Sequence, residues 1–159
     1  MSKGTRKMTI LMADDDADDR MMAREAFEAS KISNDLHFVE NGEELMAYLR
    51  REGKYADPRV SPRPGIILLD LNMPKKDGRE ALVEIRADPD LRRIPVIILT
   101  TSNSEVDVFE SYEGGANSYI SKPVTFDGLV EIIKTLDQFY FEITTLPLRR
   151  DEFESNGTH

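Results

Sequence analysis

The stretch ADDDADDR, residues 13–20, carries five aspartates within eight positions. Carboxylates repel one another, so a group this dense is either a solvated acidic surface or a place where positive charge is bound. Taken alone, the stretch fits the solvated start of a helix, with Asp16 as N-cap and Asp18 and Asp19 in the first turn. The residues elsewhere in the chain that can do chemistry, and the elements that position them, decide between the two interpretations.

Short apolar segments alternate along the chain with amphipathic segments of helical period. We expect strands at residues 8–13, 36–39, 66–69, 95–99 and 118–121, and helices at residues 18–29, 43–52, 79–87, 105–113 and 127–141. The third and fourth strands contain the uninterrupted runs IILL and VIIL, which are typical of strands buried on both faces. Five strands in strict alternation with five helices predict an α/β fold, a doubly wound five-stranded parallel sheet with helices on both faces.

In such a sheet, ligands bind at the carboxyl ends of the strands, near the point where the strand order reverses. The residues that follow strands one, three, four and five are Asp14, Asp15 and Asp16, then Asp70, then Thr100 and Thr101, then Lys122 and Pro123. A hard divalent cation such as Mg²⁺ would neutralise acids gathered there. A lysine opposite them suits the oxygens of a transferred phosphoryl group. Asp70 stands alone at the end of a buried strand and is the candidate nucleophile for an aspartyl phosphate.

The totals of the chain exclude several classes of function. It has 159 residues, which is the length of one domain, and a formal net charge of −9. That charge argues against binding to nucleic acid or to an anionic membrane, because both require a basic face. The absence of cysteine excludes disulfides, a thiol nucleophile and a zinc–thiolate site. The apolar run near the N-terminus is too short for a signal peptide or a membrane span, so we expect a cytoplasmic protein.

Four segments together resemble the receiver domains of two-component response regulators. They are the acids at 14–16, LLDLNMPKKDG at 68–78, PVIILTT at 95–101 and GANSYISKP at 115–123. The resemblance implies a flavodoxin-like (CheY-like) receiver domain at residues 1–146, with a polar tail at residues 147–159. It also implies a signalling module that catalyses only its own phosphorylation and dephosphorylation, and is otherwise not an enzyme.

The subgroup that this chain resembles is the stand-alone regulators associated with bacterial and cyanobacterial phytochromes. The segments that carry this likeness are NMPKKDGRE, DPDLRRIPV at 88–96, the proline-rich loop at 55–65 and FYFEITTLP near the end. The resemblance implies that Asp70 accepts a phosphoryl group from a histidine kinase, here a phytochrome-type kinase. Mg²⁺ would be bound by Asp15, by Asp70 and by the backbone carbonyl of Asn72, with Asp14 supporting the site through water.

The resemblance assigns the remaining site residues to the phosphoryl group and to a switch. Lys122 would contact the phosphoryl group, Thr100 would follow it inward, and Tyr119 would rotate with Thr100. This shift would change the face formed by the helix at 105–113, the strand at 118–121 and the last helix. That face would then control a homodimer or another protein partner, or the phosphoryl group would pass to a downstream phosphotransfer protein.

Some residues depart from the family pattern, and two other functions use similar parts. Thr101 stands where many receivers have a smaller residue, and Asp16 has no chemical role in the family. A Mg²⁺-dependent phosphatase of the haloacid dehalogenase type also uses an aspartate nucleophile, but it has a second acid where this chain has Asn72. A flavodoxin-like flavin or nucleotide binder needs a phosphate-cradling loop after the first strand, where this chain has aspartates.

Overall fold

The computed structural model describes residues 8–32, 34–100, 118–121 and 125–145. In chain order, the elements are β1 (Met8–Ala13), α2 (Ala17–Ser30), β2 (Asn34–Val39), α3 (Gly42–Arg50), η1 (Gly53–Tyr55), β3 (Ile66–Leu69), α4 (Gly78–Ala87), η2 (Leu91–Arg93), β4 (Val96–Thr100), β5 (Ser118–Ser121) and α6 (Phe126–Thr145). The five strands form one parallel sheet in the order β2-β1-β3-β4-β5, which confirms the predicted fold class. The helix predicted at residues 105–113 lies outside the described residues.

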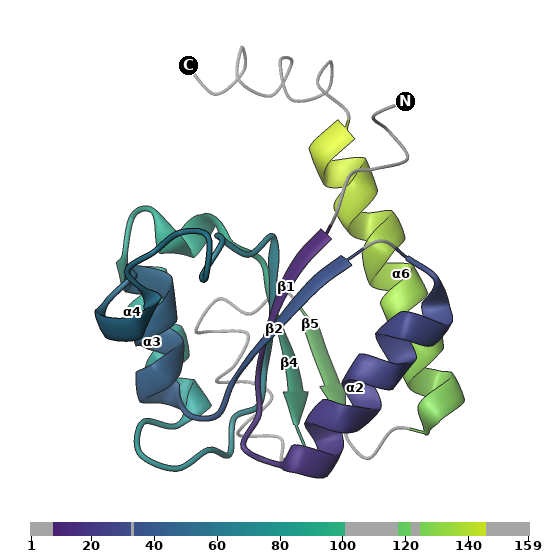
Figure 1. Ribbon diagram of the computed structural model, residues 1–159, viewed down its shortest axis with the longest axis horizontal. Coiled ribbons are helices and arrows are strands. Elements are labelled where there is room, and N and C mark those ends of the chain that lie inside the picture. Colours follow the sequence, from purple (N-terminus) through teal and green to yellow (C-terminus); the bar gives the residue numbers. More distant parts are fainter. Residues whose placement is uncertain (1–7, 33, 101–117, 122–124, 146–159) are drawn as a thin grey trace.

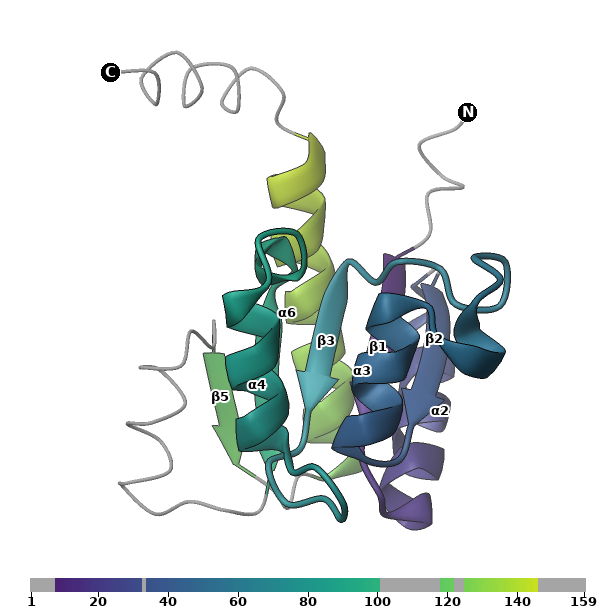
Figure 2. The same ribbon diagram turned by 90° about the vertical axis from the view of Figure 1, so that its left-hand side faces the viewer.

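The sheet is covered by two helical layers, one on each face (Figure 1). Helices α2 and α6 pack against each other on one face, and α3 and α4 do so on the other, where Figure 2 shows them in front of the sheet. Successive strand residues alternate between the layers, so Ile10 and Met12 join the α2/α6 core while Leu11 and Ala13 join the α3/α4 core. All four residues of β3 are buried, which confirms that the continuous apolar runs lie between two layers.

Several element boundaries differ from those predicted. β2 begins at Asn34 rather than at residue 36, and α6 continues to Thr145. Helix α3 ends at Arg50 because Arg51 adopts a left-handed backbone with φ of 57°, from which its N–H donates to the last turn. β4 includes Thr100 and leaves out Pro95, whose carbonyl still accepts a hydrogen bond from the Ile67 N–H at 3.0 Å.

Helix α6 presents an apolar stripe to the sheet, as expected of an amphipathic segment. Leu129, Ile133 and Leu136 are buried, and Ile132 is partly buried against the same core. The stripe is therefore used to seal the α2/α6 face of the sheet. Within the described ranges, none of the helices is both long enough and apolar enough to cross a membrane.

The turn at η1 is held against α3 by one carboxylate, that of Glu44. The Tyr55 hydroxyl donates to Glu44 Oε2 at 2.5 Å, the Glu40 N–H donates to Oε1 at 2.7 Å, and Lys54 Nζ lies 3.3 Å from Oε2. Burial by itself would raise the pKa of Glu44. The hydrogen bonds from Tyr55, Glu40 and Lys54 together outweigh burial, so the pKa of this carboxyl lies below its ordinary value.

This depressed pKa predicts an acid-labile contribution to stability. The unfolded chain takes up the proton first as the pH falls, so the contribution is present at neutral pH and is lost below the ordinary glutamate pKa of about 4.3. Urea unfolding of Glu44→Gln should show about 1 kcal/mol less stability at pH 7 and a shallower loss between neutral and acid pH. Glu43→Gln, an exposed acid of the same helical turn, is the charge-matched control. An unchanged pH slope in Glu44→Gln would contradict the assignment.

Candidate functional site

The acids that follow β1 and β3 meet at one edge of the sheet. These two strands are neighbours, and their register pairs Ala13 with Leu69, so Asp14 and Asp70 leave the sheet at the same level. The Asp70 N–H donates to the Ala13 carbonyl at 3.0 Å, which extends the pairing by one step. β1 and β3 are also the strands between which the order of this sheet reverses, where open parallel sheets bind ligands.

Three carboxylates converge at this edge. Asp14, Asp15 and Asp70 can each offer an oxygen such that all three oxygens lie within 4.8 Å of one another. Asp14 is 0% exposed and Asp70 is 7% exposed, whereas Asp15 is exposed to solvent. Two buried carboxylates at this spacing do not form a solvated helix start, because buried like charges repel strongly. The set suits a hard divalent cation, which takes carboxylate oxygens together with water and phosphate oxygens.

Each of the two buried carboxylates is oriented by a main-chain donor two residues further along. The Asp16 N–H donates to Asp14 Oδ1 at 2.9 Å, and the Asn72 N–H donates to Asp70 Oδ1 at 3.0 Å. Such local turns are a common use of aspartate after a strand. Both acids therefore begin a turn that leads the chain out of the sheet and fixes the side chain at the same time.

The loop between β3 and α4 is drawn tightly against the acidic edge by a glycine. The Gly78 N–H donates to the Leu71 carbonyl at 2.9 Å. A Cβ atom at residue 78 would lie 2.3 Å from the Asp70 carbonyl oxygen, which is backbone and has no room to move aside. Only glycine permits this close approach, so the KDG segment of the sequence reflects a steric requirement at the candidate nucleophile.

The other acids of ADDDADDR have the helical role predicted for them. Asp16 is the N-cap of α2, and its Oδ1 accepts from the Asp18 N–H at 2.8 Å and from the Asp19 N–H at 3.2 Å. Asp18 and Asp19 lie in the first turn, where negative charge complements the helix dipole. The acidic stretch therefore divides into the cluster residues Asp14 and Asp15 and three residues that start a helix.

The remaining predicted site residues are placed only in part. Thr100 is the last residue of β4 and pairs with Ser121, and Tyr119 on β5 pairs with Ile98. Tyr119 is half-buried and packs against the α3/α4 core. Asn72 is exposed at the start of the loop after β3. Lys122 and Thr101 lie outside the described residues, so their roles stay predictions.

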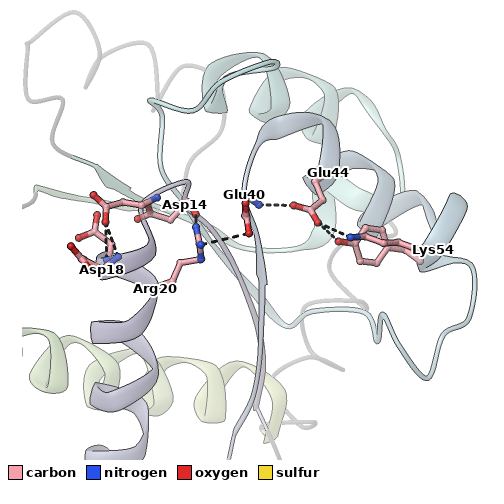
Figure 3. A network of polar contacts seen from close by, with 9 residues as sticks. Asp14, Asp18, Arg20, Glu40, Glu44 and Lys54 are labelled. Atoms are coloured by element: carbon pink, nitrogen blue, oxygen red, sulfur yellow. Dashed lines mark hydrogen bonds and ion pairs between the residues drawn. The ribbon is translucent and has the colours of Figure 1, made fainter.

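Sequence reasoning assigned no role to Arg20, the last residue of ADDDADDR. Its Nη1 donates to the main-chain carbonyl of Asp14 at 2.8 Å, and its Nη2 lies 3.5 Å from Glu40 Oε2 (Figure 3). The only sequence signal for Arg20 was its place one turn into a helix, shortly after the acidic residues that end the first strand. The partner Glu40, which lies beyond β2, is not visible from that signal.

Comparison with known proteins identifies the family to which this fold belongs. The family model for the response regulator receiver domain matches residues 10–134. Response regulator Rcp1 of Synechocystis sp. is 44% identical over 141 residues, covering 89% of this chain and 93% of Rcp1.

Two solved structures are similar along nearly their whole length. The phosphorylated cyanobacterial phytochrome response regulator RcpA superposes with a TM-score of 0.78 at 44% identity, covering 89% of this chain and 99% of RcpA. The Mn²⁺-bound form of Rcp1 superposes with a TM-score of 0.75 at 43% identity, covering 88% of this chain and 99% of that one. The fold, the three acids at the edge of the sheet and these similarities together show that the chain belongs to the response regulator receiver domain family, as a relative of the phytochrome response regulators.

Proposed function

We propose that this protein is a stand-alone response regulator that accepts a phosphoryl group on Asp70 from a histidine kinase. The observation that carries the proposal is the buried carboxylate of Asp70, which ends a central strand of a receiver fold beside Asp14 and Asp15. A carboxylate held there is a positioned nucleophile rather than a surface charge. The protein then acts by changing its contacts with other proteins.

In the proposed transfer, an oxygen of the Asp70 carboxylate forms a bond to the phosphorus of a phosphohistidine. The P–N bond breaks, its electron pair stays on the imidazole nitrogen, and Asp70 carries an acyl phosphate. The hydrogen bond from the Asn72 N–H holds one oxygen of this carboxylate in place. Lys122 would contact the phosphoryl oxygens, as the sequence predicts.

The acidic cluster fits a divalent cation, and we propose Mg²⁺. Asp15, Asp70 and the backbone carbonyl of Asn72 would hold it, with Asp14 supporting the site through water. The relative Rcp1 has been solved in a Mn²⁺-bound form, which supports a divalent ion in this family. When bound, Mg²⁺ offsets the negative charge of the carboxylates and of the phosphoryl oxygens.

Phosphorylation is proposed to act through Thr100 and Tyr119. These residues lie on β4 and β5, which are paired, so a displacement at the end of β4 reaches β5 directly. Tyr119 also packs against the α3/α4 core, which makes it a site where side-chain repacking changes the outer face. The readout is then a protein contact or onward transfer to a phosphotransfer protein.

The first test is intact mass after incubation with acetyl phosphate and Mg²⁺. Wild-type protein should gain the mass of one phosphoryl group, and Asp70→Asn should gain none because its amide is not a nucleophile. Asp18→Asn removes an exposed acid of α2 and should behave like wild type. If wild type stays unmodified, binding of beryllofluoride is measured next, because rapid hydrolysis hides an adduct. Absence of both reactions would contradict the proposal.

The kinase is proposed to be of the phytochrome type, on the strength of the likeness to RcpA. Phosphotransfer rates to this protein should be measured from a panel of autophosphorylated histidine kinases that includes phytochrome-type members. We expect the fastest transfer from a phytochrome-type kinase, with Asp70→Asn as the blank. Consistent preference for a kinase of another type would refute the phytochrome-type partner and leave the proposed acceptor role of Asp70 intact.

A homodimer is proposed through the face that contains β5 and α6. The sequence motivates it, because three consecutive aromatic residues at 139–141 cannot all point into one core. Sedimentation velocity over a concentration series should show a dimer, with a larger dimer fraction in the presence of beryllofluoride. A monomer at the highest concentration in both conditions would remove the dimer from the proposal.

A further inference from the structure

We propose that Arg20 is a positioning residue of the acidic site, which holds Asp14 in place for divalent-cation binding by bridging its main-chain carbonyl to the Glu40 carboxylate. This inference rests on the metal-dependent function proposed above. Arg20 acts through Asp14 and does not itself bind the cation.

The contact from Arg20 adds to two hydrogen bonds that Asp14 makes through its N–H and its carboxylate. The Asp14 N–H donates to the Val39 carbonyl at the end of β2, at 3.0 Å. Its carboxylate accepts from the Asp16 N–H at 2.9 Å. The carbonyl that remains accepts from Arg20 Nη1 at 2.8 Å. Arg20 thus holds the main-chain carbonyl of the residue that carries the buried carboxylate.

Arg20 is itself ordered by its surroundings. It lies in the first turn and a half of α2, where its N–H donates to the Asp16 carbonyl at 3.1 Å, and its side chain is only 19% exposed. The guanidinium has a planar fork of donors, so it can reach the carbonyl with one nitrogen and Glu40 with the other. A lysine ammonium at the same position offers one point of charge and cannot span both groups.

The far end of the bridge is attached to α3. The Glu40 side chain is 63% exposed, and an isolated ion pair of that kind contributes little. However, the Glu40 main-chain N–H donates to Glu44 Oε1 at 2.7 Å (Figure 3). The Tyr55 hydroxyl donates in turn to Glu44 Oε2 at 2.5 Å. The polar chain therefore runs from the acidic edge through Arg20 to α3 and η1.

The direction of the change in metal affinity distinguishes a positioning role of Arg20 from a purely electrostatic one. A positive side chain near a cation site repels the cation. If charge were its only role, removing Arg20 would therefore strengthen the binding of a divalent ion. Loss of positioning has the opposite effect, because the buried carboxylates repel and Asp14 is then able to move away from Asp70. The two roles predict changes of opposite direction in one measurable constant.

The test is a Mn²⁺ titration of the full chain, followed by electron paramagnetic resonance of the free ion without any phosphoryl donor. We expect Arg20→Met to bind Mn²⁺ about tenfold more weakly than wild type, a size typical of residues that orient the groups around a metal site. Arg24→Met is the matched control, because it removes the same charge from the same helix. Arg24 packs elsewhere, with its Cζ 5.0 Å from the centroid of the Phe38 ring. Its affinity should stay within about twofold of wild type.

Each outcome has a distinct meaning. Affinity in Arg20→Met that is unchanged or higher overturns the inference, and so does an equal loss in Arg24→Met. If Arg20→Met does not fold, by circular dichroism in EDTA, Arg20→Lys decides: its charge is unchanged, so a weaker affinity supports the bridge and an unchanged affinity overturns it. Wild-type protein that binds no Mn²⁺ would overturn the proposed metal site together with this inference, whereas the other negative results overturn the inference alone.

Discussion

The structure depends on the pairing of β1 with β3, which brings two buried carboxylates to the same level of the sheet. The register of these strands is set by apolar residues on both faces, among them Ile10, Leu11 and Ile67. Full burial of each such side chain contributes about 1.5–3 kcal/mol. A shift by one residue would exchange the two faces of the strand, so the register does not relax to relieve the repulsion between Asp14 and Asp70. The fold thus holds the acids together, and a cation is the natural means of offsetting their charge.

Among the described residues, main-chain groups orient the two buried acids. The carboxylates of Asp14 and Asp70 each accept a hydrogen bond from a backbone N–H, and Gly78 lets the backbone of the following loop approach the Asp70 carbonyl. Main-chain donors lose no side-chain entropy when they are ordered. These backbone hydrogen bonds orient the carboxylates through the fold itself, which suits the acceptor role proposed for Asp70.

The sequence predicted those parts of the molecule that depend on local pattern. Continuous apolar runs identified β3 and β4, and the spacing of Asp16 from the helix start identified the N-cap of α2. It also placed Asp14, Asp15 and Asp70 at one edge, because parallel strands share a direction. It did not predict the end of α3, since Arg51 takes a left-handed conformation that is usual for glycine and depends on local hydrogen bonds.

The role of Arg20 was missed for a different reason. Its contact with Asp14 spans six residues and is local, but the contact with Glu40 depends on β2 lying beside β1. Periodicity indicates which face of a helix is polar, but it does not tell which of several charged residues on that face reaches a carbonyl. A pattern of alternating acids and arginines is most often solvated surface, and only the three-dimensional positions distinguish Arg20 from Arg24.

Arg20 holds Asp14 by its main-chain carbonyl rather than by its carboxylate, and this meets two requirements of an acidic site that otherwise conflict. The carboxylate must keep its negative charge available, yet the residue must not yield to the repulsion of its neighbours. A lysine or arginine side chain paired directly with these carboxylates would hold them in place, but it would also neutralise the charge that a divalent ion needs. The Arg20 guanidinium instead contacts the Asp14 carbonyl and the Glu40 carboxylate. The Asp14 N–H donates to the Val39 carbonyl on the neighbouring strand. The attachment thus resists movement of Asp14 without neutralising its carboxylate, which is proposed to support the divalent ion through water.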